Sequence, residues 1–325
     1  RQVSQPALSL PGIHRKFECH VLRGAFSQAG RGALPHDRQA SAWAQYSLEW
    51  RGAGERAHGR CPETMAIFII AELGVNHDGS LDEAKRLIDA AKSACANACK
   101  FQMFNSRRLW GDGRIAHLEL SEAQMVILSD HAKNAGIEFL CTPFGVTEVQ
   151  FLAPLVRRMK IASGCIARYD LLAAVRKTKL PVILSTGMSD LDNIRFALKH
   201  LGPDVTLLHC TSAYPCPINA VNLKAIDRLR MFHLPVGYSD HTASIVVPIA
   251  AAARGAVVIE KHLTLDRNAS GPDHKASINP TQFKVMVDGI RRVELALGDG
   301  IKRPQSCELP LQKAWREHIS SHRTT

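Results

Sequence analysis

The sequence predicts an α/β protein, a (β/α)8 TIM barrel with an irregular N-terminal extension and a short C-terminal tail. Short apolar runs of strand length alternate with amphipathic stretches of helical spacing, eight of each, over about 235 residues. A doubly wound open sheet would need a glycine-rich phosphate turn after its first strand. The sequence has ELGVNH at 72–77 instead, which favours the barrel.

The predicted elements follow from where apolar residues recur with a strand period or a helix period. Strands are predicted at 66–71, 97–102, 137–142, 157–163, 181–186, 204–210, 234–239 and 256–262. Helices are predicted near 80–95, 121–135, 146–156, 169–178, 189–201, 220–231, 244–254 and 280–297. Ser80, Ser121 and Ser189 are the expected N-caps, because a serine hydroxyl accepts a hydrogen bond from a free amide of the first turn.

The two ends of the chain differ from the barrel region. Residues 1–64 are rich in Arg, Gly, Ala, Ser, Gln and His and keep no regular period, so we expect an irregular, disordered extension there. The barrel is predicted to span 65–301. Residues 302–325 are expected to form a tail that is too short for a second domain.

Composition narrows the class of protein further. With 46% hydrophobic and 22% charged residues, the 325-residue chain is neither disordered throughout nor fibrous. The net charge of +11 lies largely at the two ends, and no basic stripe with interleaved aromatic residues occurs, so no nucleic-acid partner is expected. No apolar run is long enough to predict a membrane span. Nine irregularly spaced cysteines without a CxxC pair indicate a reducing, cytoplasmic compartment.

Polar side chains follow every predicted strand at its carboxyl end, where a barrel of this kind has its active site. They are Glu72, Lys100, Gln102, Thr142, Lys160, Ser163, Ser185, His209, Ser212, Ser239, Asp240, His241, Glu260 and His262. A purely structural barrel interior would be filled with branched apolar side chains, and Lys and Glu are rarely buried without a partner. The pattern therefore predicts a functional site at this end of the barrel.

Lys100 and Lys160 each interrupt an apolar strand. A buried lysine is costly unless it meets an anion. Together with the hydroxyls of Thr142, Ser163 and Ser185, the two lysines would form a pocket for a phosphate or a carboxylate. The alternative is that each lysine makes a structural ion pair with one of the nearby glutamates.

His241 and His262 end adjacent predicted strands, close enough for two imidazoles to share one divalent metal ion. Glu72, Asp240 or Asp273 could complete the coordination sphere. Alternatively, Asp240 and Glu260 could orient the two rings from behind. Asp273 lies in a long polar segment after the last strand, which is expected to form a loop over the mouth and to bind substrate hydroxyls.

At these residues the chain resembles the sialic acid synthase family. The matching stretches are AELGVNHDGSLDEAKRLIDAAK (71–92), KFQ (100–102), CTPF (141–144), KIASG (160–164), LSTGM (184–188), LLHCTSAYP (207–215), VGYSDHT (236–242) and IEKHLTLDRNASGPDH (259–274). Two departures concern the acceptor sugar: many relatives have Glu in place of Cys165 and Asn in place of Ser212. Relatives also carry a C-terminal antifreeze-like domain, which we expect to be absent here.

The resemblance implies condensation of phosphoenolpyruvate with an N-acetyl-hexosamine aldehyde, either N-acetylmannosamine or a bacterial diacetamido analogue, to give a nonulosonic acid and phosphate. It implies that phosphoenolpyruvate is held by Lys100, Thr142, Lys160, Ser163, Ser185 and Ser239, with Ser212 and Tyr214 also contacting substrate. It implies a divalent metal, Mn²⁺ or Mg²⁺, on His241 and His262, and catalytic roles for Glu72, Gln102, Glu260 and Asp273. It also implies a homodimer.

Two alternatives to this function are carried forward. The chain could be a truncated, inactive relative that binds phosphoenolpyruvate or metal without turnover. It could also be a barrel aldolase that uses Lys100 or Lys160 as a Schiff base, which borohydride trapping would reveal.

Overall fold

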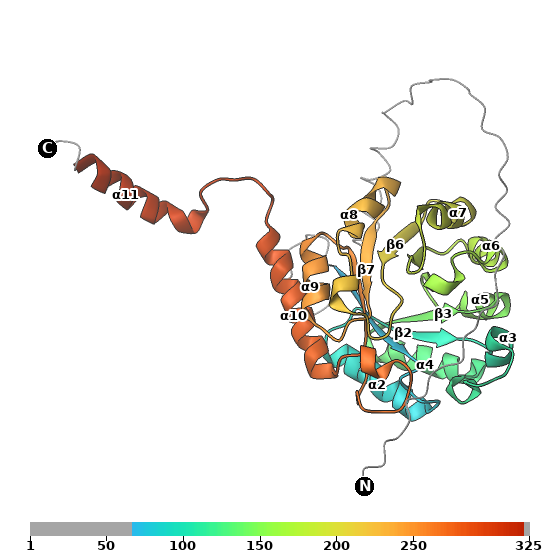
Figure 1. Ribbon diagram of the computed structural model, residues 1–325. Coiled ribbons are helices and arrows are strands. Elements are labelled where there is room, and N and C mark those ends of the chain that lie inside the picture. The colour runs from blue at the N-terminus through green and yellow to red at the C-terminus, as the bar shows by residue number, and fades with distance from the viewer. Residues whose placement is uncertain (1–66, 322–325) are drawn as a thin grey trace, which may run out of the picture. The chain divides into compact units, whose positions relative to one another are not determined.

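The computed structural model describes residues 67–321. Eight parallel strands form one sheet in the order β3-β2-β1-β8-β7-β6-β5-β4, and β3 and β4 lie against each other at the seam. Helices surround this nearly closed ring (Figure 1). The predicted (β/α)8 barrel is therefore confirmed, whereas the predicted extension at 1–64 lies outside the described residues.

The strands and helices alternate along the chain. The strands are β1 Phe68–Gly74, β2 Ala98–Met103, β3 Glu138–Pro143, β4 Met159–Ile161, β5 Val182–Ser185, β6 Val205–His209, β7 Val236–Asp240 and β8 Val258–His262. The helices are α2 Leu81–Ser93, α3 Ser106–Trp110, α4 Glu122–Ala135, α5 Val146–Leu152, α6 Tyr169–Thr178, α7 Leu191–Leu201, α8 Ala225–Leu229, α9 Val246–Ala253, α10 Pro280–Leu297 and α11 Leu309–Ser321. Each predicted strand and helix has a counterpart among them.

Two of the three predicted caps are found where expected. The Ser80 hydroxyl accepts from the first turn of α2, and Ser121 caps α4 as part of a reciprocal capping box. The prediction for Ser189 is wrong, because Asp190 caps α7, its carboxylate accepting from two backbone amides of the first turn at 2.9 Å. The Ser189 hydroxyl instead donates to the carbonyl of Gly187.

Two predicted helices are shorter than expected. Helix α5 ends at Leu152 rather than near 156, because Pro154 has no amide hydrogen with which to continue the helical hydrogen bonds. Helix α8 covers only Ala225–Leu229 of the predicted 220–231, with a 3-10 turn on each side. The predicted tail contains α11.

Inside the barrel the strands carry an apolar layer beneath a polar one. The lower layer is a buried cluster of Phe68, Ile70, Ala98, Leu140, Ile183, Leu208 and Val258. Because successive strand residues point to opposite faces, the next inward positions are two residues further along. Those positions hold Glu72 on β1, Lys100 on β2 and Thr142 on β3. The polar site thus stands on an apolar floor.

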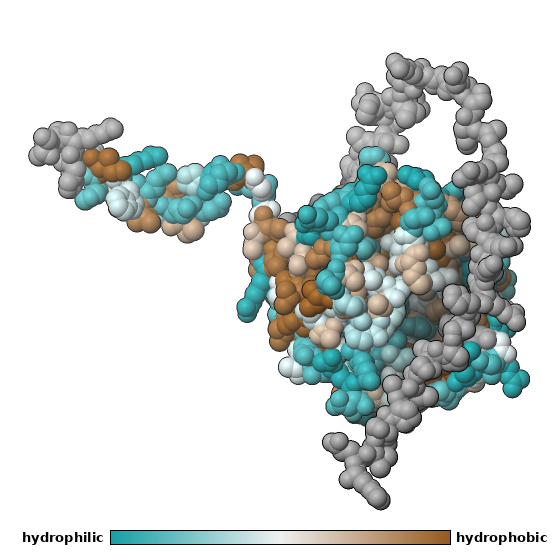
Figure 2. Space-filling model, in the orientation of Figure 1, coloured by the Kyte–Doolittle hydropathy of each residue, from teal (hydrophilic) through white to brown (hydrophobic). Residues whose placement is uncertain are grey.

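The larger core lies between the outer face of the sheet and the helices. On the outside of the helix layer, Figure 2 shows hydrophobic surface over the region of α9 and α10. Val246 of α9 and Val285 and Leu295 of α10 are at least half exposed. Within residues 67–321, no helix combines the length and the apolar character that a membrane crossing requires.

Candidate active site

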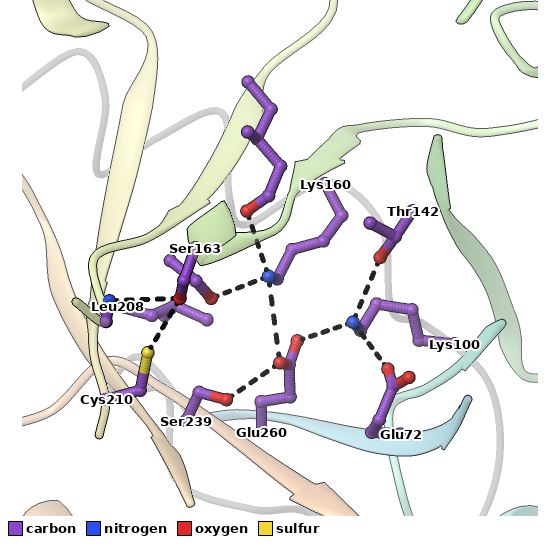
Figure 3. Close-up of polar contacts among 12 residues, drawn as sticks. Glu72, Lys100, Thr142, Lys160, Ser163, Leu208, Cys210, Ser239 and Glu260 are labelled. Atoms are coloured by element: carbon purple, nitrogen blue, oxygen red, sulfur yellow. Dashed lines mark hydrogen bonds and ion pairs between the residues drawn. The ribbon is translucent and has the colours of Figure 1, made fainter. Parts of the chain in front are cut away.

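The carboxyl ends of the strands bring most of the predicted site residues to the mouth of the barrel, and several of them form one connected group of polar contacts. Lys100 stands at its centre, 4% exposed. Its Nζ lies 2.5 Å from Glu72 Oε2, 3.4 Å from Glu260 Oε2 and 3.2 Å from Thr142 Oγ1, to which it donates (Figure 3). Gln102 donates from Nε2 to the other oxygen of Glu72 at 2.9 Å. Four strands contribute to this cluster.

Lys160, just inside β4, approaches the carboxylate of Glu260, which stands on β8 across the barrel (Figure 3). It is 2% exposed, and its ammonium donates to Ser185 Oγ at 2.7 Å and to the Ile161 carbonyl at 3.2 Å. An ammonium has three donors. The third faces Glu260 Oε1 at 3.8 Å, beyond hydrogen-bonding distance. Lys160 therefore keeps one N–H group that could donate a hydrogen bond to an anion in the mouth.

Both lysines thus stand beside glutamates, as the ion-pair alternative expected, and both also stand at the mouth, as the anion pocket requires. Burial opposes the charge on Glu260, but Lys100 and Lys160 hold the pKa of Glu260 down at about 2. Burial, with the nearby charge of Glu260, raises the pKa of Glu72 to about 7. Glu260 is therefore the ionised carboxylate at neutral pH, and Glu72 is the one that can take up a proton.

A second cluster of polar groups surrounds Gly187, just after β5. The Gly187 amide donates to Ser163 Oγ at 3.0 Å, and the Cys210 thiol lies 3.2 Å from that same oxygen. A Cβ at Gly187 would stand 2.3 Å from the Ser212 hydroxyl and 2.9 Å from that of Ser163. The lack of a side chain at this position lets two hydroxyls and a backbone amide crowd together, as an oxyanion requires.

The two predicted metal ligands face each other across the ends of β7 and β8, with ring centroids 5.5 Å apart. His241 donates from Nδ1 to the carbonyl of Thr211 at 2.7 Å, which leaves Nε2 near the Tyr214 hydroxyl at 3.1 Å. In His262, Nδ1 is buried and has no hydrogen-bond partner among the described residues. Burial lowers the pKa of both imidazoles, so both are neutral, as metal ligands must be.

Within residues 67–321, no three His, Cys, Asp or Glu side chains gather at metal-ligand spacing. Two neutral imidazoles, one with an orphaned buried nitrogen, nevertheless fit a cation whose remaining positions are filled by water or substrate, since catalytic sites keep positions open. His241 and His262 are thus the residues that could hold a metal ion.

Asp273 enters the site from the loop that follows β8. Its Oδ2 lies 3.6 Å from His262 Nδ1, and burial raises the pKa of its carboxyl to about 6. Gly74, with a positive φ, allows this approach, because a Cβ there would stand about 3 Å from oxygens of Glu72 and Asp273. The loop is closed at its base by a bridge between Leu263 and Ile278, so Asp273 is held at a fixed place over the mouth.

Three residues at the strand ends need separate mention. Asp240 was considered as a metal ligand or as a group that orients the rings, and it points out of the barrel and pairs with Lys261, so it does not face the space between the rings. His209 also lies away from the mouth, with Nε2 2.7 Å from the carbonyl of Val221. Cys210 was not among the predicted site residues, yet its thiol belongs to the cluster around Gly187. Strand alternation predicts all three directions.

Comparison with known proteins gives consistent matches. Residues 87–302 match the NeuB family. The chain is 42% identical over 303 residues to "N,N'-diacetyllegionaminic acid synthase" of Legionella pneumophila, covering 84% of this chain and 85% of that protein. It is 36% identical to the human "N-acetylneuraminate-9-phosphate synthase", covering 74% of each. A solved N-acetylneuraminic acid synthetase from Leptospira borgpetersenii, in complex with citrate, superposes with a TM-score of 0.73 at 36% identity, covering 77% and 91%.

Proposed function

The chain belongs to the NeuB family of nonulosonic acid synthases, and we propose that it condenses phosphoenolpyruvate with an acetamido-hexose aldehyde. The products are a nonulosonic acid and inorganic phosphate. The acceptor we favour is a diacetamido hexose, because identity is higher to the diacetyllegionaminic acid synthase, at 42%, than to the human N-acetylneuraminate-9-phosphate synthase, at 36%.

The observation that carries this proposal is the pair of buried ammonium groups around Glu260. Lys100 and Lys160 approach its two oxygens at 3.4 and 3.8 Å, whereas a tight charge-assisted bond measures about 2.8 Å. Neither ammonium is therefore tightly bonded to Glu260, although Lys100 also pairs with Glu72 at 2.5 Å. A donor with both a phosphate and a carboxylate would bind Lys160 directly and Lys100 in competition with Glu72, with the hydroxyls of Ser163 and Ser185 as further donors. The Ser239 hydroxyl donates to Glu260 at 2.9 Å and would have to turn toward the anion.

The acceptor half of the site lies nearer the loops. Tyr214 and Asp273 flank the two imidazoles, and Gln102 reaches in beside Glu72. Hydroxyl groups of a sugar could be bound here by the Asp273 carboxylate and the Gln102 amide. His241 and His262 would hold the divalent cation, Mn²⁺ or Mg²⁺, which when bound polarises the aldehyde carbonyl as a Lewis acid.

The proposed reaction forms one C–C bond and one C–O bond and breaks the C–O bond to phosphate. C3 of phosphoenolpyruvate attacks the aldehyde carbon, and the aldehyde oxygen takes up a proton to become a hydroxyl. Water adds at C2, and the bond from C2 to the phosphate oxygen breaks as phosphate leaves. A carboxylate must receive the proton that the water loses. Glu72 and Asp273 are suited to this role, because their pKa values of about 7 and about 6 lie near neutrality.

A coupled assay of phosphate release tests the proposal. We expect release from phosphoenolpyruvate only when an acetamido-hexose and Mn²⁺ are both present, and faster release with a diacetamido hexose than with N-acetylmannosamine. Binding of phosphoenolpyruvate without release with either sugar would support the inactive relative instead. Borohydride trapping of the donor on a lysine would support the Schiff-base aldolase.

The raised pKa of Glu72 makes a prediction for stability. Between about pH 4.5 and pH 7 the folded protein keeps a proton on Glu72 that the unfolded chain has lost, so this group contributes stability that fades as pH rises. From pH 4.5 to pH 8 the wild type should lose this contribution, whereas Glu72→Gln has no proton to lose. We therefore expect the free energy of unfolding of Glu72→Gln, measured relative to that of the wild type, to rise by on the order of 2 kcal/mol over this range.

Urea denaturation at several pH values measures this difference. Glu122→Gln, at an exposed position in the first turn of α4, is the control variant. A difference between wild type and Glu72→Gln that stays constant with pH would show that Glu72 has an ordinary pKa.

A further inference from the structure

A fully buried ion pair lies behind the two imidazoles, on the opposite face of the same strands. Asp240 is the last residue of β7 and directly precedes His241, and Lys261 directly precedes His262 on β8. The register of the two strands places Asp240 and Lys261 opposite each other. Because side chains alternate between faces, the imidazoles point into the mouth while this pair points toward the helix layer.

The pair is tightly held and shielded from water. Asp240 and Lys261 are both 0% exposed, with Nζ 2.7 Å from Oδ2. Asp240 Oδ1 accepts from the Tyr238 hydroxyl at 2.8 Å and from the Thr242 amide at 3.2 Å, and Oδ2 accepts from the Thr242 hydroxyl at 2.9 Å. Lys261 donates a further bond to the carbonyl of Thr242. These contacts link the carboxyl end of β8 to that of β7.

Burying such a pair is a weak source of stability, because desolvation of two charges offsets most of their attraction. A buried ion pair of this kind is best explained by the geometry that it imposes. Here that geometry is the alignment of β7 with β8 at the last residue before each imidazole.

We propose that Asp240 and Lys261 are positioning residues that fix the separation of His241 and His262 for a shared divalent cation. This inference rests on the metal site of the proposed function. It is favoured by the contrast between the two rings. His241 has its own anchor at the Thr211 carbonyl, whereas Nδ1 of His262 has no hydrogen-bond partner within residues 67–321. The place of His262 then depends on its backbone, which is held by β1 on one side and, through Lys261, by β7 on the other.

The test replaces the pair in the full-length chain by Asp240→Asn with Lys261→Met. Asparagine keeps an acceptor for Tyr238 and Thr242, and methionine keeps the length of the lysine without its charge. The matched control is Glu138→Gln with Arg158→Met, which removes an ion pair at the amino end of β3 and β4, with distances of 2.8 and 3.1 Å. Mn²⁺ affinity is measured by calorimetry, and coordinated imidazole nitrogens are counted by electron spin-echo spectroscopy.

We expect the dissociation constant for Mn²⁺ to rise by about 10- to 100-fold in the Asp240/Lys261 variant. We expect one fewer coordinated imidazole nitrogen and unchanged binding of inorganic phosphate. The control variant should bind Mn²⁺ as the wild type does.

Wild-type Mn²⁺ affinity in a folded Asp240/Lys261 variant would overturn the positioning role while leaving the proposed function intact. Absence of Mn²⁺ binding in the wild type would overturn the metal site and this inference with it. If the double variant does not fold, Thr242→Val is tested instead. It removes the hydrogen bond from the Thr242 hydroxyl to Asp240 and should weaken Mn²⁺ binding about threefold. An unchanged affinity in that variant would also overturn the proposal.

Discussion

Replacing Lys160 by methionine is expected to lower kcat/KM for phosphoenolpyruvate by about 10³-fold, or about 4 kcal/mol of transition-state stabilisation. Lys160 holds a donor that faces the mouth without a partner at hydrogen-bonding distance. Its removal also takes away one of the two lysines beside Glu260, so the negative charge in the pocket would repel the donor.

Steady-state kinetics with the donor varied at saturating acceptor measures this loss, and calorimetry with inorganic phosphate measures the binding part of it. Lys133→Met, on the exposed side of α4, is the matched control and should leave both unchanged. A folded Lys160→Met variant within tenfold of wild type would rule out Lys160 as a donor-binding group.

Replacing His262 by alanine is expected to abolish metal-dependent turnover, with a loss of at least about 10³-fold in kcat. The two imidazoles are the nitrogen ligands that we propose for the metal, and their rings stand 5.5 Å apart. Binding of inorganic phosphate should persist, because neither Lys100 nor Lys160 bonds to His262.

The readout is phosphate release over a titration with Mn²⁺, set beside phosphate binding by calorimetry. His117→Ala, at an exposed position after α3, is the matched control. Release that stays at the wild-type level without His262 would show that no metal is held there.

The barrel could be predicted because its physical cause is visible in one dimension. A strand buried on both faces is a short apolar run, and a helix packed on it is a stretch of period 3.6, so the alternation indicates the fold. The site could be predicted because the fold delivers all eight strand ends to one place. Lys100 and Lys160 each interrupt an apolar run, and any barrel of this kind would bring two such strand positions to the same end.

What could not be predicted depends on contacts across the barrel. The sequence does not state which glutamate stands nearer to which lysine, and hence that Glu260 is ionised while Glu72 keeps a raised pKa. The crowding at Gly187 by Ser163 and Ser212 likewise exists only after folding. The outward direction of Asp240, by contrast, was available from strand alternation, since its neighbour His241 points inward.

The apolar layer fills the barrel beneath the site, so the site opens at the carboxyl ends of the strands. A ligand that reaches Lys100 and Lys160 would therefore enter and leave by the same end of the barrel. On the proposed function, a sugar held by the loop that carries Asp273 would lie at that end, so we expect it to slow the release of the donor bound beneath it.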